Sequence, residues 1–420
     1  MHSPLDPLGS RPTSRRDALR LGAMAAAALA LSACGSRGKN TGSGGGSTTA
    51  TKTAKIGVIA PLSGDLSALG LGIKNSVDLA VKQANAANAI PGWTLTVDAQ
   101  DDQASPDTGK NAASALSSDT AVVGVVGTLN SSVAQTVAPV LASAHIVQVS
   151  PANTNPSLTQ GPDFATAPKR VYATYFRTCT TDSIQGPFAA RYVYNTLKIT
   201  KVATLHDKKT YGQGLVAAFT EEYKKLGGTI TRAETINPDD RNFGSIITKL
   251  KVGSPALLYY GGEFPQSGPL SLQMKQSTLK IPLMGGDGMY SADYIKLAGG
   301  KTGIGDLATS VGAPVDTLPS AKKFVADYKA AGYKEAYEAY GAYSYDAANA
   351  IIEALKVSLK SAASVADALQ PTVDAMKNVS FEGVTGKVAF DEFGDTTSKV
   401  LTVYKDTGTT WVPALTDTFK

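Results

Sequence analysis

Residues 121–159, AVVGVVGTLNSSVAQTVAPVLASAHIVQVSPANTNPSLT, contain the pattern that decides the fold. Two apolar runs, AVVGVVG at 121–127 and HIVQVSP at 145–151, flank SSVAQTVAPVLASA at 131–144, which has helical periodicity. Strand, helix and strand in turn predict two parallel strands joined by a crossover helix. The residues that follow the second strand are small and polar and include no catalytic acid, base or thiol. They therefore raise the question of what such a loop does.

The same alternation extends along the chain from Lys55. It includes AKIGVIAPLSG at 54–64 and WTLTVDAQDD at 93–102, and a second series runs from KVATLHD at 201–207 to IPLMGGDG at 281–288. At 420 residues the chain is long enough for two domains. We therefore predict an α/β fold with two successive units, each an open, mostly parallel sheet flanked by helices.

The charge of the chain does not favour nucleic acid or an anionic membrane surface as a partner. The formal charge of +5 falls to +3 without residues 1–33, because that segment holds four arginines and two aspartates. So small and scattered an excess gives no reason to expect binding to nucleic acid or to an anionic membrane surface.

The first 54 residues predict export and anchoring. SRRDALR at 14–20 precedes the short apolar run LGAMAAAALALSAC at 21–34, which is too short for a permanent membrane span. We interpret residues 1–33 as a signal peptide and Cys34, in the lipobox-like LSAC, as the lipidation site. The paired Arg15 and Arg16 resemble a twin-arginine signal without its usual Phe, so both export routes stay open. The Gly/Ser/Thr-rich residues 34–54 form a flexible tether with a reach of roughly 25 Å.

Motifs for metal, nucleotide or hydrolytic chemistry are missing from the sequence. Three histidines give no zinc site, and DAQDDQASPD at 98–107 lacks the Gly and terminal Glu of a calcium loop, so Ser105 is expected to cap a helix. Neither G-x-S-x-G nor a phosphate-binding loop occurs. Cys179 is more typical of a small buried residue than of a reactive thiol. We expect no cofactor, no metal and no enzymatic activity.

Loops after the strands are where an open α/β sheet binds its ligand. In the second unit these include HDKKTYG at 206–212, GGEFPQ at 261–266 and GGDGMYS at 285–291. In the first unit, Ser131 begins a helix, where free backbone N–H groups favour an anion such as a carboxylate.

These loops, in their order, resemble the leucine/isoleucine/valine-binding protein family, the type I substrate-binding proteins of ABC transporters. The motifs that carry the resemblance are IGVIAPLSGDLSALG, VVGTLNSS through VSPANTNPSLT, HDKKTYGQGL, YYGGEFPQ and LMGGDGMYS. The resemblance covers the chain from Lys55 and implies two lobes that close on a small ligand. It implies three crossover strands, near 178–182, 309–313 and 391–397. The implied lobes are residues 55–178 with 312–392, and residues 179–311 with 393–420.

The family's ligand contacts can be carried over residue by residue. Ser131 and Thr154 match the residues that hold an amino acid's carboxylate, and Ala152 matches the one whose carbonyl receives the ammonium. Asp287 matches the acidic residue of the second lobe that pairs with the ammonium, and Tyr211 matches a tyrosine that lines the cleft.

Three departures from branched-chain amino-acid binders stand out. Ser105 and Asn130 replace a bonded cysteine pair, Leu69 replaces an aromatic residue that covers the ligand, and Glu263 replaces a tyrosine. A carboxylate beside an aliphatic side chain is costly unless it is paired. Either the ligand has a polar or cationic group, or Glu263 faces away. Of the tyrosines in YEAYGAYSYDAANAI at 337–351, we expect most to pack and one or two to face the cleft.

Taken together, the sequence predicts a lipid-anchored, monomeric receptor on the outer face of the cell membrane. It would bind a small amino acid, of the branched-chain type or a polar relative, and deliver it to ABC transporter permease subunits. Binding of an amide, urea or another small polar metabolite, and a ligand-sensing role, stay open as alternatives.

Overall fold

The computed structural model of the protein describes residues 51–420. The predicted signal peptide, Cys34 and nearly all of the predicted tether lie outside the described residues. Strand β1 begins at Lys52, so the last three residues assigned to the tether belong to the folded part instead.

The first sheet has five strands, all parallel, in the order β2-β1-β3-β4-β5. They are β1 (Lys52–Ala60), β2 (Trp93–Asp101), β3 (Val122–Gly127), β4 (Val147–Ser150) and β5 (Tyr175–Arg177). The strands predicted in residues 121–159 are β3 and β4, which pair in parallel from Gly124 with Val147 to Val126 with Val149. The strand–helix–strand unit predicted from residues 121–159 is therefore confirmed.

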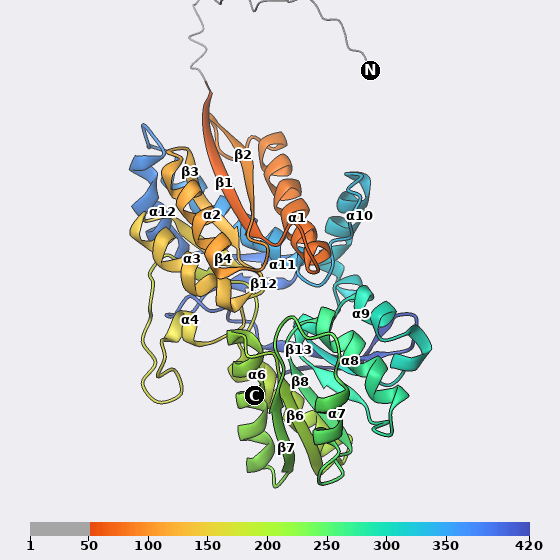
Figure 1. Ribbon diagram of the computed structural model, residues 1–420. Helices are drawn as coiled ribbons and strands as arrows, with labels where there is room; N and C mark the ends of the chain where they lie inside the picture. Colours follow the sequence, from red (N-terminus) through yellow and green to blue (C-terminus); the bar gives the residue numbers. More distant parts are fainter. Residues whose placement is uncertain (1–50) are drawn as a thin grey trace, which may run out of the picture. The chain divides into compact units, whose positions relative to one another are not determined.

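Alternating side chains of the first sheet pack on two layers of helices. Helices α1 (Ser67–Ala86) and α11 (Gly341–Ser358) pack together on one face, while α2 (Pro106–Ser118) and α3 (Ser131–Ser143) pack together on the other (Figure 1). On β1, Ile56 and Val58 belong to the core beneath α1 and α11, whereas Ile59 belongs to the core beneath α2 and α3. This alternation is the two-residue period of a strand buried on both faces. As predicted, Ser105 caps α2, accepting a hydrogen bond from the Thr108 N–H.

The second sheet has seven strands in the order β14-β13-β10-β9-β8-β6-β7. Its parallel part consists of β6 (Lys201–His206), β7 (Thr229–Thr235), β8 (Leu257–Gly261), β9 (Leu283–Gly285) and β10 (Leu307–Val311). Strands β13 (Val400–Asp406) and β14 (Trp411–Thr418) extend it in antiparallel fashion. One face is covered by α5 (Asp182–Arg191) and α6 (Thr210–Lys225), the other by α7 (Gly244–Leu250), α8 (Phe264–Gln276) and α9 (Ala292–Leu297).

We call the elements packed on the first sheet the first lobe and those packed on the second sheet the second lobe. Besides the helices named above, the first lobe includes α4 (Ser157–Gln160), α10 (Lys322–Ala330), α12 (Leu369–Met376), and the hairpin β11 (Ser380–Gly383) with β12 (Gly386–Ala389). The chain passes between the lobes three times, after β5, after β10 and between β12 and β13. The predicted fold class, two α/β lobes with three crossovers, is confirmed.

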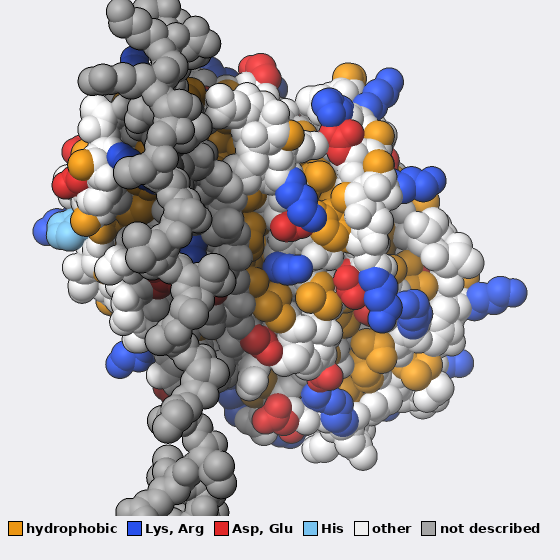
Figure 2. Space-filling view, turned by 90° about the horizontal axis from the view of Figure 1, so that it is seen from above, with side chains coloured by type: hydrophobic (Ala, Val, Ile, Leu, Met, Phe, Trp, Pro, Cys, Tyr) orange, Lys and Arg blue, Asp and Glu red, His pale blue; other side chains and the backbone are white. Residues whose placement is uncertain are grey.

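The face of the molecule in Figure 2 shows basic and acidic side chains interspersed among apolar and neutral ones. Within residues 51–420, no helix combines the length and apolarity that crossing a membrane requires.

Candidate functional site

One small cavity lies where loops of both lobes meet. Its volume is about 20 Å³, roughly enough for one water molecule. The first lobe contributes Leu69, Leu129, Asn130, Ala152 and Tyr340, and the second contributes Tyr211, Glu263, Asp287 and Gly288. Several of these residues directly follow β3, β4, β8 and β9, so the cavity sits at the carboxyl ends of both sheets, where open α/β sheets bind ligands.

Asp287 is one of two buried carboxyl groups in this cavity, with only 2% of its surface exposed. Its Oδ1 accepts hydrogen bonds from the Tyr211 hydroxyl at 2.8 Å and the Gln185 amide at 2.9 Å. Burial raises the pKa of Asp287, although the hydrogen bonds from Gln185, Tyr211 and Tyr340 oppose that shift. No lysine, arginine or histidine of residues 51–420 forms an ion pair with it, so the carboxylate is hydrogen-bonded but lacks a cation.

Tyr340 connects the two lobes through Asp287. It lies just before α11 of the first lobe, and its hydroxyl donates to Asp287 Oδ2 at 2.8 Å. This tyrosine belongs to the tyrosine-rich segment in which one or two side chains were expected to face the cleft.

Glu263 also faces the cavity, but its charge is already compensated. It is 5% exposed, and its Oε2 pairs with Lys209 Nζ at 2.9 Å. Its Oε1 accepts from the Asn130 amide of the first lobe at 2.6 Å, which forms a second connection between the lobes. The pKa of Lys209 is raised chiefly by Glu263. The carboxylate thus neither faces away nor waits unpaired for a cationic ligand.

Backbone packing holds Leu69 at the cavity, and hydrogen bonds hold Tyr211 there. A Cβ atom on Gly70 would lie 1.9 Å from the carbonyl oxygen of Pro61, so α1 rests directly on the turn after β1 and holds Leu69 at the cavity. Tyr211, at the start of α6, donates to Asp287 and accepts from the Gly288 N–H at 3.1 Å.

The first-lobe loop that follows β4 is largely buried, but of its residues only Ala152 lines the cavity. Within the described residues, the Ala152 carbonyl oxygen accepts no backbone or side-chain hydrogen bond. Thr154 is fully buried outside the lining, with its hydroxyl beside the Asp182 carboxyl but without a well-aligned partner. Ser131, the first residue of α3, is buried next to the cavity residue Asn130.

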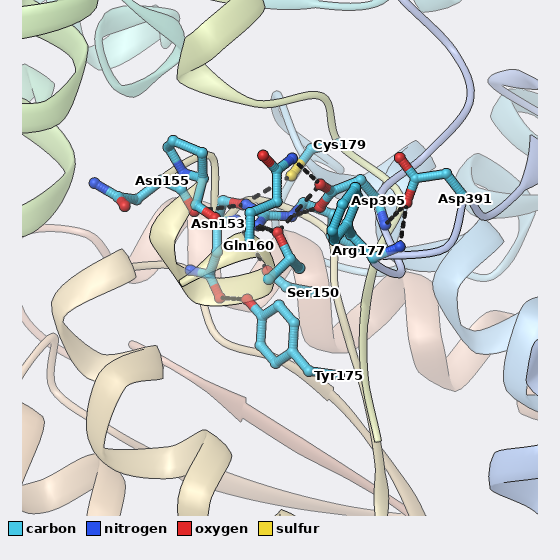
Figure 3. Close-up of polar contacts among 12 residues, drawn as sticks. Ser150, Asn153, Asn155, Gln160, Tyr175, Arg177, Cys179, Asp391 and Asp395 are labelled. Atoms are coloured by element: carbon cyan, nitrogen blue, oxygen red, sulfur yellow. Dashed lines mark hydrogen bonds and ion pairs between the residues drawn. The ribbon is translucent and has the colours of Figure 1, made fainter. Parts of the chain in front are cut away.

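A buried arginine fixes this loop to the crossover segments (Figure 3). The Arg177 guanidinium donates to the carbonyl oxygens of Asn153 and Asn155, the latter at 3.0 Å. It also forms an ion pair, 2.6 Å from Nε to Oδ1, with Asp395 in the third crossover. Asp395 in turn accepts from Gln160 at 2.8 Å. The loop therefore owes its shape to an ion pair between the last residue of β5 and a residue of the third crossover.

Of the seven predicted ligand residues, five surround one cavity: Leu69, Ala152, Tyr211, Glu263 and Asp287. Ser131 and Thr154 lie in the same loops without lining it. Sequence reasoning did not assign Gln185 and Lys209 to the site, nor Asn130 and Tyr340 as contacts between the lobes. Asn130 directly precedes Ser131, and Tyr340 lies in a conspicuous run of tyrosines, whereas nothing in the sequence marks Gln185.

Cys179 is buried beside the first crossover, and burial raises the pKa of its thiol far above the ordinary value. This is the small buried residue that the sequence favoured, because a thiol that stays protonated is a weak nucleophile. Among the described residues, no group of three His, Cys, Asp or Glu side chains is arranged to hold a metal ion.

Comparison with known proteins agrees with the geometry. The family model described as periplasmic binding protein matches residues 53–405. A Leu/Ile/Val-binding protein homologue from Brucella melitensis is 31% identical over 350 residues, which cover 83% of this chain and 90% of that protein. The Leu/Ile/Val-binding protein BraC3 of Rhizobium johnstonii is 32% identical over 350 residues, with the same 83% and 90% coverage.

Among solved structures, the chain is similar to the branched-chain amino acid transporter substrate-binding protein LivJ from Streptococcus pneumoniae, determined in complex with isoleucine. The TM-score is 0.76 and the identity 25%, over 88% of this chain and 100% of that one. The resemblance stated from the loops is therefore confirmed. The chain belongs to the periplasmic binding protein family.

Proposed function

We propose that this protein is a lipid-anchored, extracytoplasmic substrate-binding protein of an ABC transporter, which binds a small amino acid between its lobes and delivers it to a permease. The proposal includes lipidation at Cys34, a monomeric state, and lobe boundaries at 55–178 with 312–392 and 179–311 with 393–420. The observation that carries it is Asp287, a buried carboxylate with three hydrogen-bond donors and no cation from residues 51–420, in a cavity that both lobes build.

An ammonium group is the ligand feature that such a site recognises best. A buried anion is stabilised by a cation that hydrogen-bonds to it, and the unpartnered carbonyl of Ala152 offers the same ammonium a second acceptor. The N-terminus of α3, beginning at Ser131, supplies free N–H groups for a carboxylate. An amino acid carries both groups. The names of the similar proteins, which refer to leucine, isoleucine and valine, support the same ligand class.

The side chain of the ligand meets a compensated surface. Glu263 already forms an ion pair with Lys209 and accepts a hydrogen bond from Asn130. Its negative charge is therefore neutralised and does not attract a cationic ligand side chain. We therefore favour an aliphatic or small uncharged side chain over that of a basic amino acid. A polar relative that hydrogen-bonds to this group is the second candidate. An amide or urea, or a signalling role for the same clamp, is the alternative to amino-acid transport.

Isothermal titration calorimetry with a ligand panel tests the proposal. The panel comprises valine, leucine, isoleucine, lysine, arginine, small amides, urea, and leucine's analogue without its amino group. We expect an aliphatic amino acid to bind at least tenfold more tightly than the basic ones, and the deaminated analogue not to bind. Tight binding of urea or an amide alone would replace the amino-acid assignment by the alternative.

The variant Asp287→Asn isolates the role of the carboxylate. Loss of a buried charge partner costs about 2–5 kcal/mol, so amino-acid affinity should fall by about thirtyfold or more. Asp65→Asn is the matched control, because Asp65 is an exposed carboxylate that pairs with Arg241 of the second lobe and does not line the cavity. Equal affinities for both variants would refute the role given to Asp287.

A further inference from the structure

A second cavity, with a volume of about 370 Å³, lies between the lobes beyond Asp287 and Tyr340. Its size falls in the usual range of small-molecule sites. The second lobe lines it with Tyr290, Tyr404 and Trp411, and the segments that lead into α11 line it with Tyr337 and Glu338. None of these residues takes part in the site proposed above.

Aromatic rings form one wall of this cavity, and the polar atoms of two of them, Trp411 and Tyr337, are already hydrogen-bonded. The rings of Tyr290 and Tyr404 stack with centroids 4.1 Å apart, and Trp411 lies 6.0 Å from Tyr290. The indole N–H of Trp411 donates to the Ser291 carbonyl at 2.8 Å, and the Tyr337 hydroxyl donates to Asp316 at 2.7 Å. Trp411 and Tyr337 therefore offer a ligand mainly ring surface, and the electron-rich faces of such rings attract cations.

The charged side chains in the lining are all acidic. Asp316 and Glu338 line the cavity, and no lysine, arginine or histidine does so. Asp316 is engaged by Tyr337, but Glu338 forms no ion pair within the described residues. The nearby Lys296 pairs instead with Asp293, at 2.6 Å. Burial and the repulsion from Asp293 raise the pKa of this half-buried Glu338 carboxylate, whereas Lys296 and a hydrogen bond with Ser291 oppose the rise.

The backbone at Glu338 is strained. Its φ of +51° lies in the left-handed region, which residues with a side chain adopt uncommonly. Strain of this kind persists where the surroundings impose it, and it is concentrated at functional sites. Here it fixes the segment that carries the Glu338 carboxylate.

We propose that this second cavity binds a small organic cation, an alkylated or quaternary ammonium, against Tyr290, Tyr404 and Trp411, with Glu338 as its counter-charge. Charge complementarity selects a cation, and the aromatic wall selects one that is weakly hydrated and apolar at its surface. A metal ion is not favoured, because no three His, Cys, Asp or Glu side chains of residues 51–420 are grouped to hold one.

Occupancy of the second cavity should be coupled to the first. Gly288 and Tyr340 line the small cavity, whereas Tyr290 and Glu338, two residues away from each, line the large one. A cation held there would bias the closure of the lobes, and each ligand would change the affinity of the other by the same factor. This coupling, unlike the site itself, rests on the proposed function.

The chain contains a built-in reporter for the test. It has two tryptophans, Trp93 in the first sheet and Trp411 in the cavity wall. In the variant Trp93→Phe, fluorescence therefore reports on Trp411 alone. We would titrate this variant with choline chloride, and separately with the uncharged isostere in which carbon replaces the quaternary nitrogen, at constant ionic strength. Choline should change the emission saturably and raise the melting temperature, and it should bind at least tenfold more tightly than the isostere.

Substitution of the carboxylate completes the test. In the Trp93→Phe background, Glu338→Gln should weaken choline binding tenfold or more and leave the isostere unaffected. Glu353→Gln removes the same charge from the exposed face of α11, where Glu353 pairs with Lys356, and should leave both unaffected. No saturable emission change with choline, or equal affinities for choline and the isostere, would overturn the proposal. So would unchanged choline affinity in Glu338→Gln.

The coupling is tested separately by measuring, with and without saturating choline, the affinity for the amino acid that binds most tightly in the calorimetry panel. If no amino acid binds while choline binds, the proposed function fails and the cation site stands. If the amino acid binds with an affinity that choline does not alter, the two cavities are independent, and only the coupling is wrong.

Discussion

Replacing Arg177 by methionine should produce one of the largest losses of stability available from a single substitution in this fold. The guanidinium is fully buried, pairs with Asp395 at 2.6 Å, and donates to the carbonyl oxygens of Asn153 and Asn155. Methionine has a similar length but no charge and no donor. The substitution therefore leaves a buried carboxylate and two loop carbonyls without their partner.

The magnitude follows from the unpaired carboxylate. Removing one partner of a buried ion pair costs about 3–5 kcal/mol, because the remaining charge stays desolvated. The Gln160 amide still donates to Asp395, so the lower half of that range is the better expectation. An unfolding entropy of about 2 cal/mol/K per residue gives roughly 0.8 kcal/mol/K for residues 51–420, so the melting temperature should fall by about 4–5 °C.

A double-mutant cycle monitored by circular dichroism checks this reasoning. The proteins are wild type, Arg177→Met, Asp395→Asn and the double variant. Because the double variant removes both charges, it should recover about 2 kcal/mol or more relative to the sum of the single losses. Strictly additive losses would refute the view that the pair itself holds the loop. So would a loss below about 1 kcal/mol in Arg177→Met.

Three other substitutions test different parts of the structure. Asn130→Asp places a second carboxylate beside Glu263, and the repulsion between them opposes closure of the lobes. Ligand binding should weaken about tenfold, and the radius of gyration measured by small-angle X-ray scattering should increase. The control Asn130→Ser adds no charge and should have smaller effects on both. Burial raises the pKa of Asp182 to about 8. The folded state therefore retains a proton that the unfolded state loses near pH 4, so stability should fall as the pH rises from about 4 to about 8. Urea unfolding at several pH values should show a smaller decline in Asp182→Asn; an unchanged slope would mean that another group causes it. Gly70→Ala should lower stability by about 1–3 kcal/mol because its Cβ would clash with the Pro61 carbonyl, even though alanine is the better helix former. A rise in melting temperature would show that α1 does not pack against Pro61.

Sequence patterns predicted the layers of this fold because strand and helix periodicity are local. The parallel pairing of β3 with β4 could be inferred from residues 121–159 alone. The rule that ligands bind at the carboxyl ends of strands then selected the loops that contain Ala152, Glu263 and Asp287.

What sequence reasoning missed depends on pairings between distant residues. Asp395 lies 218 positions after Arg177, in the implied third crossover, and nothing local indicates that a fully buried arginine needs it. Glu263 drew attention as an unexplained charge because its partners, Lys209 and Asn130, come from other loops and one from the other lobe. A residue's type can be read from the chain, but whether its charge is satisfied depends on tertiary structure.

The contacts between the lobes explain how the proposed clamp could discriminate among ligands at closure. The cavity of about 20 Å³ holds one water molecule, so an amino acid can enter only after the lobes separate and the Tyr340 hydroxyl leaves Asp287. Without ligand, re-closure restores that neutral donor. With ligand, an ammonium takes its place and forms a stronger, charge-assisted bond. Since a ligand shifts an equilibrium only by its differential affinity for the two states, a molecule without the cation gains little from closure. Selection for an ammonium would then act when the lobes close, not when the ligand enters.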